Sequence, residues 1–194
     1  MKKEIITITG TLGSGKSSTA DRVAEKLGFR RFSSGDFMRK LAVEMGISLN
    51  ELSIKAQTDP EIDVKIDDEV KKAGNEEKIV IDSRLAFHWI PESFKIYLDL
   101  PPQIAKERIL NNLKENTLRK QSENSSSPEE IQTKIDARLL SEKKRYKELY
   151  GIENHTDKTN FDLVVDTNKN NLEQVVELVI SEYKKWLGLL LKDF

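Results

Sequence analysis

The chain has 194 residues, about the size of one ordinary domain, and 37% of them are hydrophobic, which is enough for one core. Its 32 basic and 33 acidic residues give a formal net charge of −1, which argues against a broad cationic surface for non-specific nucleic-acid binding. It contains no cysteine, which excludes disulfides and thiol chemistry, and no stretch has the character of a signal sequence or a membrane span, so we expect a cytoplasmic protein.

The amino-terminal part of the chain predicts a strand, a glycine-rich turn and two helices. The β-branched run at residues 3–9 is typical of a strand, and it stops at Gly10. Apolar residues at helical spacing then predict a helix that Gly28 ends. A second helical pattern follows the residues SSGD at 33–36 and stops at Gly46.

The rest of the chain predicts further helices and strands in alternation. Ser48 and Glu51 form a capping box for a third helix, and Pro60 opens a fourth that ends at Gly74. Apolar runs predict strands at 78–82, 94–99 and 161–166. Apolar stripes predict helices at about 102–113, 128–150 and 172–186. Strands that alternate with helices predict a parallel sheet covered on both faces.

Residues 111–127 interrupt this pattern with a polar stretch. They carry only Leu113 and Leu118 as large apolar side chains amid asparagine, lysine, glutamate and serine. Such a stretch cannot bury much surface by itself. It therefore predicts a mobile flap between two helices.

The strongest motif is a phosphate-binding loop between the first strand and the first helix. Residues 10–17, GTLGSGKS, match the pattern of glycine, four residues, glycine, lysine and serine. The glycines allow a tight turn in which backbone amides and the positive end of the helix converge on phosphate oxygens. Lys16 adds a charge beside the transferred phosphoryl group, and Ser17 offers its hydroxyl to Mg²⁺. The motif predicts a nucleotide site.

A second Mg²⁺ ligand is expected at the end of a strand. Asp82 ends the strand at 78–82 and can hold the ion directly or through water, and Asp99 ends the next strand similarly. For each of them the alternative is an aspartate that only bonds to nearby loop amides. Arg84, two residues beyond Asp82, favours Asp82 as the ligand.

Six arginines are candidates for a second anion site, which a phosphoryl acceptor would need. Arginine holds phosphate with two parallel hydrogen bonds, whereas most single arginines are solvated surface residues. The candidates are Arg39, Arg84, Arg108, Arg119, Arg138 and Arg145. Arg138, Glu142 and Arg145 stand at i, i+4 and i+7 on one helix face. Glu142 can hold both arginines toward the phosphates, and pairing within the helix is the alternative.

These ordered motifs resemble the nucleoside monophosphate kinases, and within them the short cytidylate kinases of archaeal type. The matching segments are GTLGSGKSS at 10–18, SSGDFMR at 33–39, DPEID at 59–63 and IDSRLA at 81–86. The segments IYLDLP at 96–101, RYKELYGI at 145–152 and FDLVVDT at 161–167 follow in the family's order. Several motifs in order are more specific than one loop.

The resemblance implies an α/β fold of the P-loop NTPase type, with a five-stranded parallel sheet and helices on both faces. It implies a single domain over residues 1–194, with a helical acceptor-binding insert at about 34–76 and a lid at about 111–145. Residues that would bind ATP are Gly10, Thr11, Leu12, Gly13, Ser14, Gly15, Lys16, Ser17, Ser18 and Arg108. Residues that would bind the acceptor are Ser34, Gly35, Asp36, Arg39, Arg84 and Glu142.

The resemblance also implies which groups act during transfer. Lys16, Arg138 and Arg145 would be catalytic, and Ser17 and Asp82 would hold Mg²⁺. The chain departs from the family in three places. Ser83 stands where the family has glycine, Asn111 and Asn112 stand where it has a second arginine, for which Arg119 is a substitute, and the flap is longer than usual.

The implied function is phosphoryl transfer from ATP to CMP and dCMP by a monomer, with a homodimer as the alternative. Its partners would be small-molecule nucleotides, with no nucleic acid and no membrane. One alternative function is a kinase for another acceptor, namely UMP, AMP or a small hydroxyl metabolite. The other is an ATP-binding switch that hydrolyses ATP slowly and regulates a partner.

Overall fold

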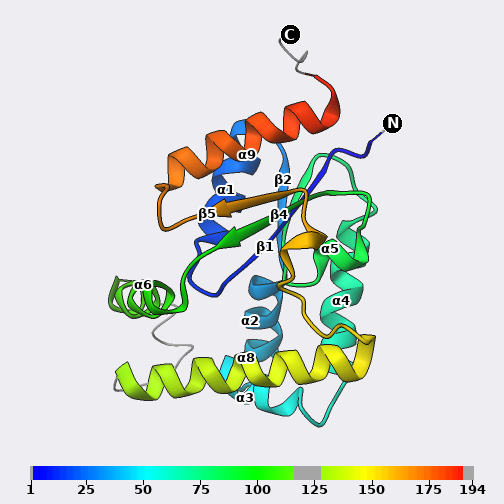
Figure 1. Ribbon diagram of the computed structural model, residues 1–194. Helices are drawn as coiled ribbons and strands as arrows, with labels where there is room; N and C mark the ends of the chain where they lie inside the picture. Colours follow the sequence, from blue (N-terminus) through cyan, green and yellow to red (C-terminus); the bar gives the residue numbers. More distant parts are fainter. Residues whose placement is uncertain (1, 116–127, 190–194) are drawn as a thin grey trace.

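The centre of the fold is a five-stranded parallel sheet with the strand order β2-β3-β1-β4-β5 (Figure 1). The computed structural model describes residues 2–115 and 128–189. Its strands are β1 (Ile5–Gly10), β2 (Arg30–Ser33), β3 (Ile79–Asp82), β4 (Phe94–Asp99) and β5 (Leu163–Asp166). All four strand pairs are parallel, so the carboxyl ends of the strands share one edge of the sheet. This architecture confirms the predicted fold class.

Helices cover both faces of the sheet. The helices of the described residues are α1 (Lys16–Leu27), α2 (Ser34–Glu44), α3 (Leu49–Lys55), α4 (Glu61–Ala73), α5 (Ala86–Trp89), α6 (Pro102–Glu115), α8 (Pro128–Tyr150) and α9 (Leu172–Leu187), with a 3₁₀ turn, η1 (Lys158–Asn160). Helices α1 and α9 lie on one face, and α4 and α5 lie on the other (Figure 1). This is the arrangement that crossover connections between parallel strands require.

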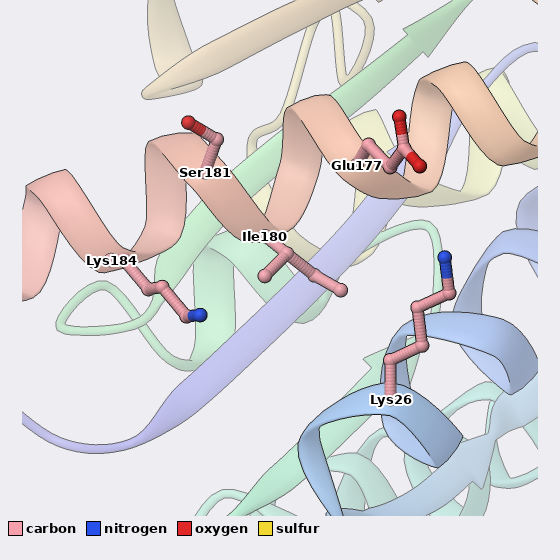
Figure 2. A pocket seen from close by; sticks show the side chains of 5 residues that line it. All are labelled: Lys26, Glu177, Ile180, Ser181 and Lys184. Carbon is pink, nitrogen blue, oxygen red and sulfur yellow. The ribbon is translucent and has the colours of Figure 1, made fainter.

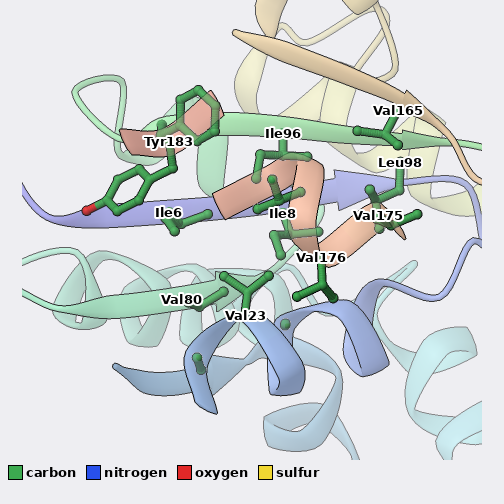
Figure 3. Packing of buried hydrophobic residues seen from close by; sticks show 14 residues of the cluster. Ile6, Ile8, Val23, Val80, Ile96, Leu98, Val165, Val175, Val176 and Tyr183 are labelled. Atoms are coloured by element: carbon green, nitrogen blue, oxygen red, sulfur yellow. The ribbon is translucent and has the colours of Figure 1, made fainter. Parts of the chain in front are cut away.

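The alternation of side chains along β1 builds both halves of the core. Ile6 and Ile8 point to the face where Val23 of α1 and Val176 of α9 meet them (Figure 3). Ile5 points to the opposite face, toward α4 and α5. All six residues of β1 are buried, as expected for a strand at the centre of a doubly covered sheet. The strand is therefore a rigid support for the loop that follows it.

Helices α2, α3 and α4 form a smaller unit beside the sheet. They pack on one another through a separate apolar cluster that contains Ala42, Leu52, Ala56, Ile62 and Ile66. Ser48 and Glu51 make the predicted capping box at the start of α3, and Gly74 follows α4 as predicted. The sequence patterns over residues 34–74 therefore predicted the helices of this unit.

Two elements and one boundary differ from the sequence patterns. The runs of apolar residues revealed neither β2 nor the single-turn helix α5. β2 has the sequence RRFS, in which arginines hide the apolar pattern. It lies at the edge of the sheet, where one side needs no strand partner.

Residues 111–115 continue α6 and so do not belong to the flap. The remainder of the predicted flap, with Leu118 and Arg119, lies outside the described residues. Among the helices described, none combines the length and the apolar character that a membrane crossing needs.

Candidate active site

The loop after β1 has the backbone that the phosphate-binding motif predicts. A Cβ atom on Gly10 would lie 2.3 Å from the carbonyl oxygen of Leu98, so only glycine allows β1 and β4 to come this close. A Cβ on Gly13 would lie 2.9 Å from the carbonyl oxygen of Ala105 in α6. Gly15 precedes α1 with a φ of 86°, which favours glycine. The amino end of α1 consequently faces the loop without a side-chain cap, as an anion site requires.

Two side chains of the loop, Lys16 and Ser14, lie where a bound anion would meet them. Lys16 Nζ donates to the carbonyl oxygens of Gly10 at 3.0 Å and Thr11 at 2.9 Å, so its charge is held over the loop. Ser14 is only 2% exposed, and its Oγ has no hydrogen-bond partner in the described part of the chain. A buried hydroxyl without a partner costs free energy unless a ligand satisfies it. This loop therefore fits a phosphate chain.

Ser17 and Asp82 meet at the carboxyl edge of the sheet, as predicted. Ser17 Oγ donates to Asp82 Oδ2 at 2.8 Å, and Asp82 is buried. Two hard oxygens beside a phosphate loop fit Mg²⁺, which takes few protein ligands and keeps several waters. The other candidate, Asp99, accepts from Lys158 Nζ at 2.6 Å. This geometry favours Asp82 over Asp99 as the metal ligand.

The predicted acceptor-binding segment begins α2 next to this pair. Ser33 Oγ accepts from the backbone amide of Asp36 and caps the helix, and Ser34 Oγ donates to the Asp82 carbonyl oxygen at 3.4 Å. Asp36 Oδ1 accepts from Arg39 Nη2 at 2.5 Å, and the Arg39 guanidinium lies beside Gly35. Burial alone would raise the pKa of Asp36, but the hydrogen bond and charge of Arg39, aided by Arg31, lower it below its ordinary value. Asp36 is therefore an anion at neutral pH.

Arg84 and Glu142 form a buried ion pair between the loop after β3 and α8. Arg84 Nη1 lies 2.6 Å from Glu142 Oε2, and the two side chains are 14% and 4% exposed. Thr9 Oγ1 donates to the Ser83 carbonyl oxygen at 2.9 Å and fixes the backbone just before Arg84. Ser83 is buried here, so a serine fits at the position where the family that the sequence resembles has glycine.

Arg145, which shares a helix face with Glu142, pairs with a different helix. Arg145 Nε donates to Asp63 Oδ2 of α4 at 2.6 Å, and both side chains are 7% exposed. Burial raises the pKa of Asp63, although the bond and charge of Arg145 offset part of this effect. The structure thus holds α8 against α4 at this point. The side chain of Arg138 lies outside the described residues.

Arg108 lies on the side of the loop where α6 packs. Its Nη2 donates to the Thr167 carbonyl oxygen at 2.7 Å, just after β5. Because α6 also contacts Gly13 through Ala105 and Ile109, Arg108 is on the same side of the sheet edge as the phosphate loop. Its role at the ATP side stays a prediction.

Two residues beside these groups were missed by the sequence patterns. Arg31 of β2 contacts both Asp36 and Asp82. His155 follows α8 and is half-buried, and burial together with the charge of Arg84 lowers its pKa to about 4, so it is neutral at pH 7. Arg31 could have been suspected as a charged residue just before SSGD. The periodicity of the sequence gives no signal for His155, because it lies in a loop.

Asp67 of α4 is a buried carboxyl group near Arg145's partner Asp63. Burial raises the pKa of Asp67 to about 6, although Tyr150 and Trp89 offset part of the effect. The folded protein therefore binds a proton between pH 4 and 6 that the unfolded chain releases near pH 4. The contribution of Asp67 to the free energy of unfolding is largest at low pH and is lost as the pH rises through about 6.

Replacing Asp67 with asparagine is expected to remove this pH dependence. When the pH is raised from 4.5 to 7.5, the unmodified chain should lose about 2 kcal/mol of unfolding free energy that the variant does not lose, since one pKa unit corresponds to about 1.4 kcal/mol. Urea unfolding at several pH values measures the difference, with the exposed neighbour Asp68→Asn as the control. A difference that is independent of pH would contradict the assignment of a raised pKa to Asp67.

A pocket elsewhere on the surface contains none of these residues. It lies between α1 and α9 and is lined by Lys26, Glu177, Ile180, Ser181 and Lys184 (Figure 2). Lys26 is in the last turn of α1, at the opposite end of the helix from Lys16. The pocket is therefore not a candidate for the active site.

Comparisons with known proteins identify the family of the chain. Residues 6–132 match the family described as "AAA domain". A cytidylate kinase of Methanocella arvoryzae is 37% identical over 93% of this chain and 99% of that protein. An S-adenosylmethionine-dependent nucleotide dehydratase of Lacinutrix mariniflava is 33% identical over 94% of this chain, which spans only 36% of that longer protein.

Structural similarity extends to other kinases of the same fold. A shikimate kinase from Acinetobacter baumannii in complex with shikimate has a TM-score of 0.59 and covers 98% of this chain and 96% of its own, at 15% identity. At this identity the likeness shows the fold alone. The identity and coverage of the Methanocella kinase are much higher, and further cytidylate kinases are 32–36% identical. The chain therefore belongs to the cytidylate kinase family of the P-loop kinases, which makes it an ATP-dependent nucleoside monophosphate kinase.

Proposed function

We propose that the chain transfers the γ-phosphoryl group of ATP to the 5′-phosphate of CMP, giving ADP and CDP, with dCMP as a second acceptor. The observation that carries this proposal is the grouping of two kinds of site at one edge of the sheet. The phosphate loop with Ser17 and Asp82 lies there, and α2 with Arg39 and the loop after β3 with Arg84 begin at the same edge. The names of the relatives support cytidine as the base.

The two sites divide the substrates between them. The loop residues Gly10–Ser17, with Arg108 on the α6 side, would bind ATP. The unit of α2, α3 and α4 would be the acceptor-binding insert, with Asp36 and Arg39 at its opening. Ser17 and Asp82 would hold Mg²⁺, which when bound neutralises charge on the phosphates.

The reaction needs no covalent intermediate on the protein. An oxygen of the CMP phosphate forms a bond to the γ-phosphorus while the bond from that phosphorus to the bridging oxygen of ADP breaks, and the electron pair stays on ADP. The CMP phosphate is ionised at neutral pH, so no general base is required. The protein aligns the two phosphates and screens their repulsion with Lys16 and Arg84.

Helix α8 would close the site against water. The ion pair Arg84–Glu142 holds α8 to the loop after β3, and the ion pair Asp63–Arg145 holds it to α4. Figure 1 shows α8 running along the unit of α2, α3 and α4. Water that reached the γ-phosphate would compete with CMP for transfer. Arg138 and Arg145 on this helix are the proposed lid arginines, and Arg145 would leave its pair with Asp63 to reach a phosphate.

An acceptor panel tests the proposal. ADP formation is measured with ATP, Mg²⁺ and each of CMP, dCMP, UMP, AMP, GMP and shikimate, and the products are separated by chromatography. We expect kcat/KM for CMP and dCMP to exceed that for the other acceptors by about tenfold or more. A preference for AMP or shikimate would contradict the choice of acceptor. ADP and inorganic phosphate without a phosphorylated acceptor would indicate a nucleotide-dependent switch.

A further inference from the structure

Arg31 makes ion pairs with three carboxylates from three different elements. Its Nε lies 3.1 Å from Asp21 Oδ1 of α1, its Nη1 lies 2.9 Å from Asp36 Oδ2 of α2, and its Nη2 lies 3.5 Å from Asp82 Oδ2 of β3. Only 22% of its side chain is exposed. Each nitrogen of the guanidinium group thus lies within ion-pair distance of a different acid, and Nη1 donates a hydrogen bond to Asp36. The compact ammonium group of a lysine could not reach all three acids in this way.

Two of these acids belong to opposite sides of the proposed reaction. Asp82 Oδ2 also accepts from Ser17 Oγ at 2.8 Å, so Arg31 shares the oxygen that faces the metal side. Asp36 uses its other oxygen, Oδ1, for Arg39 at 2.5 Å, so Arg31 also fixes the carboxylate that orients the acceptor-side arginine. Arg31 is therefore in contact with both halves of the site without being part of the phosphate loop.

The charges of the cluster explain what this arrangement can do. Without Arg31, the carboxylates of Asp21, Asp36 and Asp82 would lose the cation that they share, while Asp36 would keep its ion pair with Arg39. A cation attracted to Asp82 has to compete with the guanidinium group that already lies 3.5 Å from it. Arg39, on the other side, would lose the support that keeps its partner Asp36 in place.

We propose that Arg31 is a positioning residue that joins the metal side of the site to the acceptor side, an inference that rests on the proposed function. It holds Asp36, and through it Arg39, in the orientation that receives the acceptor phosphate. It also reduces the attraction of Asp82 for a divalent cation in the ligand-free protein. Its removal must therefore act in opposite directions on two equilibria: the cation binds more tightly and the acceptor more weakly.

The test uses Arg31→Met, which keeps an unbranched apolar stem and removes the guanidinium group with its charge. Mn²⁺ binding to the ligand-free protein is measured by electron paramagnetic resonance, and the KM for CMP is measured in the coupled assay. We expect the Mn²⁺ dissociation constant to fall by about threefold to tenfold and the KM for CMP to rise by about tenfold, with a smaller change in kcat. Arg30→Met is the matched control, because Arg30 is the exposed neighbour on β2 that pairs with Glu76, and both quantities should stay unchanged.

The outcomes separate this proposal from a purely structural role and from the proposed function. A structural role would lower the melting temperature of Arg31→Met and leave both quantities unchanged, which would overturn the inference. A shift in only one quantity would also overturn it, because Arg31 would then not join the two sides. If Arg31→Met is too unstable to study, Arg31→Lys replaces it. We then expect an increase in the KM for CMP, because the single nitrogen of lysine cannot contact all three acids. An unchanged KM would contradict the proposal. If the unmodified chain phosphorylates no nucleoside monophosphate, the proposed function fails, and the Mn²⁺ titration still reports on Arg31 and Asp82.

Discussion

Replacing Lys16 with methionine is expected to lower kcat for phosphoryl transfer by about a thousandfold. The Nζ of Lys16 is held over the loop by the carbonyl oxygens of Gly10 and Thr11, so its charge is already in place before the substrate arrives. Removing one prearranged donor to a developing negative charge costs about 10²–10³ in rate. Methionine keeps an unbranched apolar stem of similar length and removes the ammonium group, with its charge and its hydrogen bonds. Initial rates at saturating ATP and CMP measure the effect.

The control for this change lies on the same helix. Lys26, in the last turn of α1, pairs with Glu173 on the surface at 2.9 Å, and Lys26→Met should leave kcat unchanged. Circular dichroism of both variants establishes that the fold is intact. If kcat of the Lys16→Met protein is within about fivefold of that of the unmodified chain, Lys16 of the phosphate loop does not take part in phosphoryl transfer.

Replacing Arg84 with methionine is expected to raise the KM for CMP by about a hundredfold and to destabilise the fold. The side chain lies in a buried ion pair with Glu142, so its loss leaves a buried carboxylate without its charged partner Arg84. Breaking such a pair by removing one member costs about 3–5 kcal/mol, and losing a charged hydrogen bond to a phosphate costs about 2 kcal/mol or more of binding. Urea unfolding and steady-state kinetics measure the two effects separately.

A double variant distinguishes the two roles of Arg84. Arg84→Met combined with Glu142→Leu removes both charges of the pair. Most of the lost unfolding free energy should return, because the buried carboxylate is removed together with the arginine. The KM for CMP should stay high. Arg22→Gln, in an exposed cluster with Glu25 and Glu173, is the control and should change neither quantity appreciably. If the double variant regains a normal KM for CMP, Arg84 does not bind the acceptor phosphate.

Much of the fold could be predicted because its signals are local. The capping box of Ser48 and Glu51, Gly28 after α1 and the loop at residues 10–17 depend on neighbours in the sequence, and the structure has each of them as expected. The pairing of Ser17 with Asp82 was also predictable, since parallel strands place their carboxyl ends at one edge.

The partners of the buried charges could not be predicted from spacing. Residues at i, i+4 and i+7 share a helix face, but this rule does not say which distant group the face meets. Glu142 meets Arg84, and Arg145 meets Asp63, each on another element of the fold. Arg31 was missed for a related reason. The strand β2 is short and lies at the sheet edge, and the role of Arg31 depends on three acids that belong to three other elements of the fold.

The most direct test of the account is a crystal structure with Mg²⁺ and an analogue in which adenosine and cytidine are joined by five phosphates. The account predicts that the polyphosphate runs from the loop at residues 10–17 to the guanidinium groups of Arg39 and Arg84, with Mg²⁺ beside Ser17 and Asp82. A structure in which the cytidine end lies elsewhere, and neither Arg39 nor Arg84 contacts a phosphate, would contradict it.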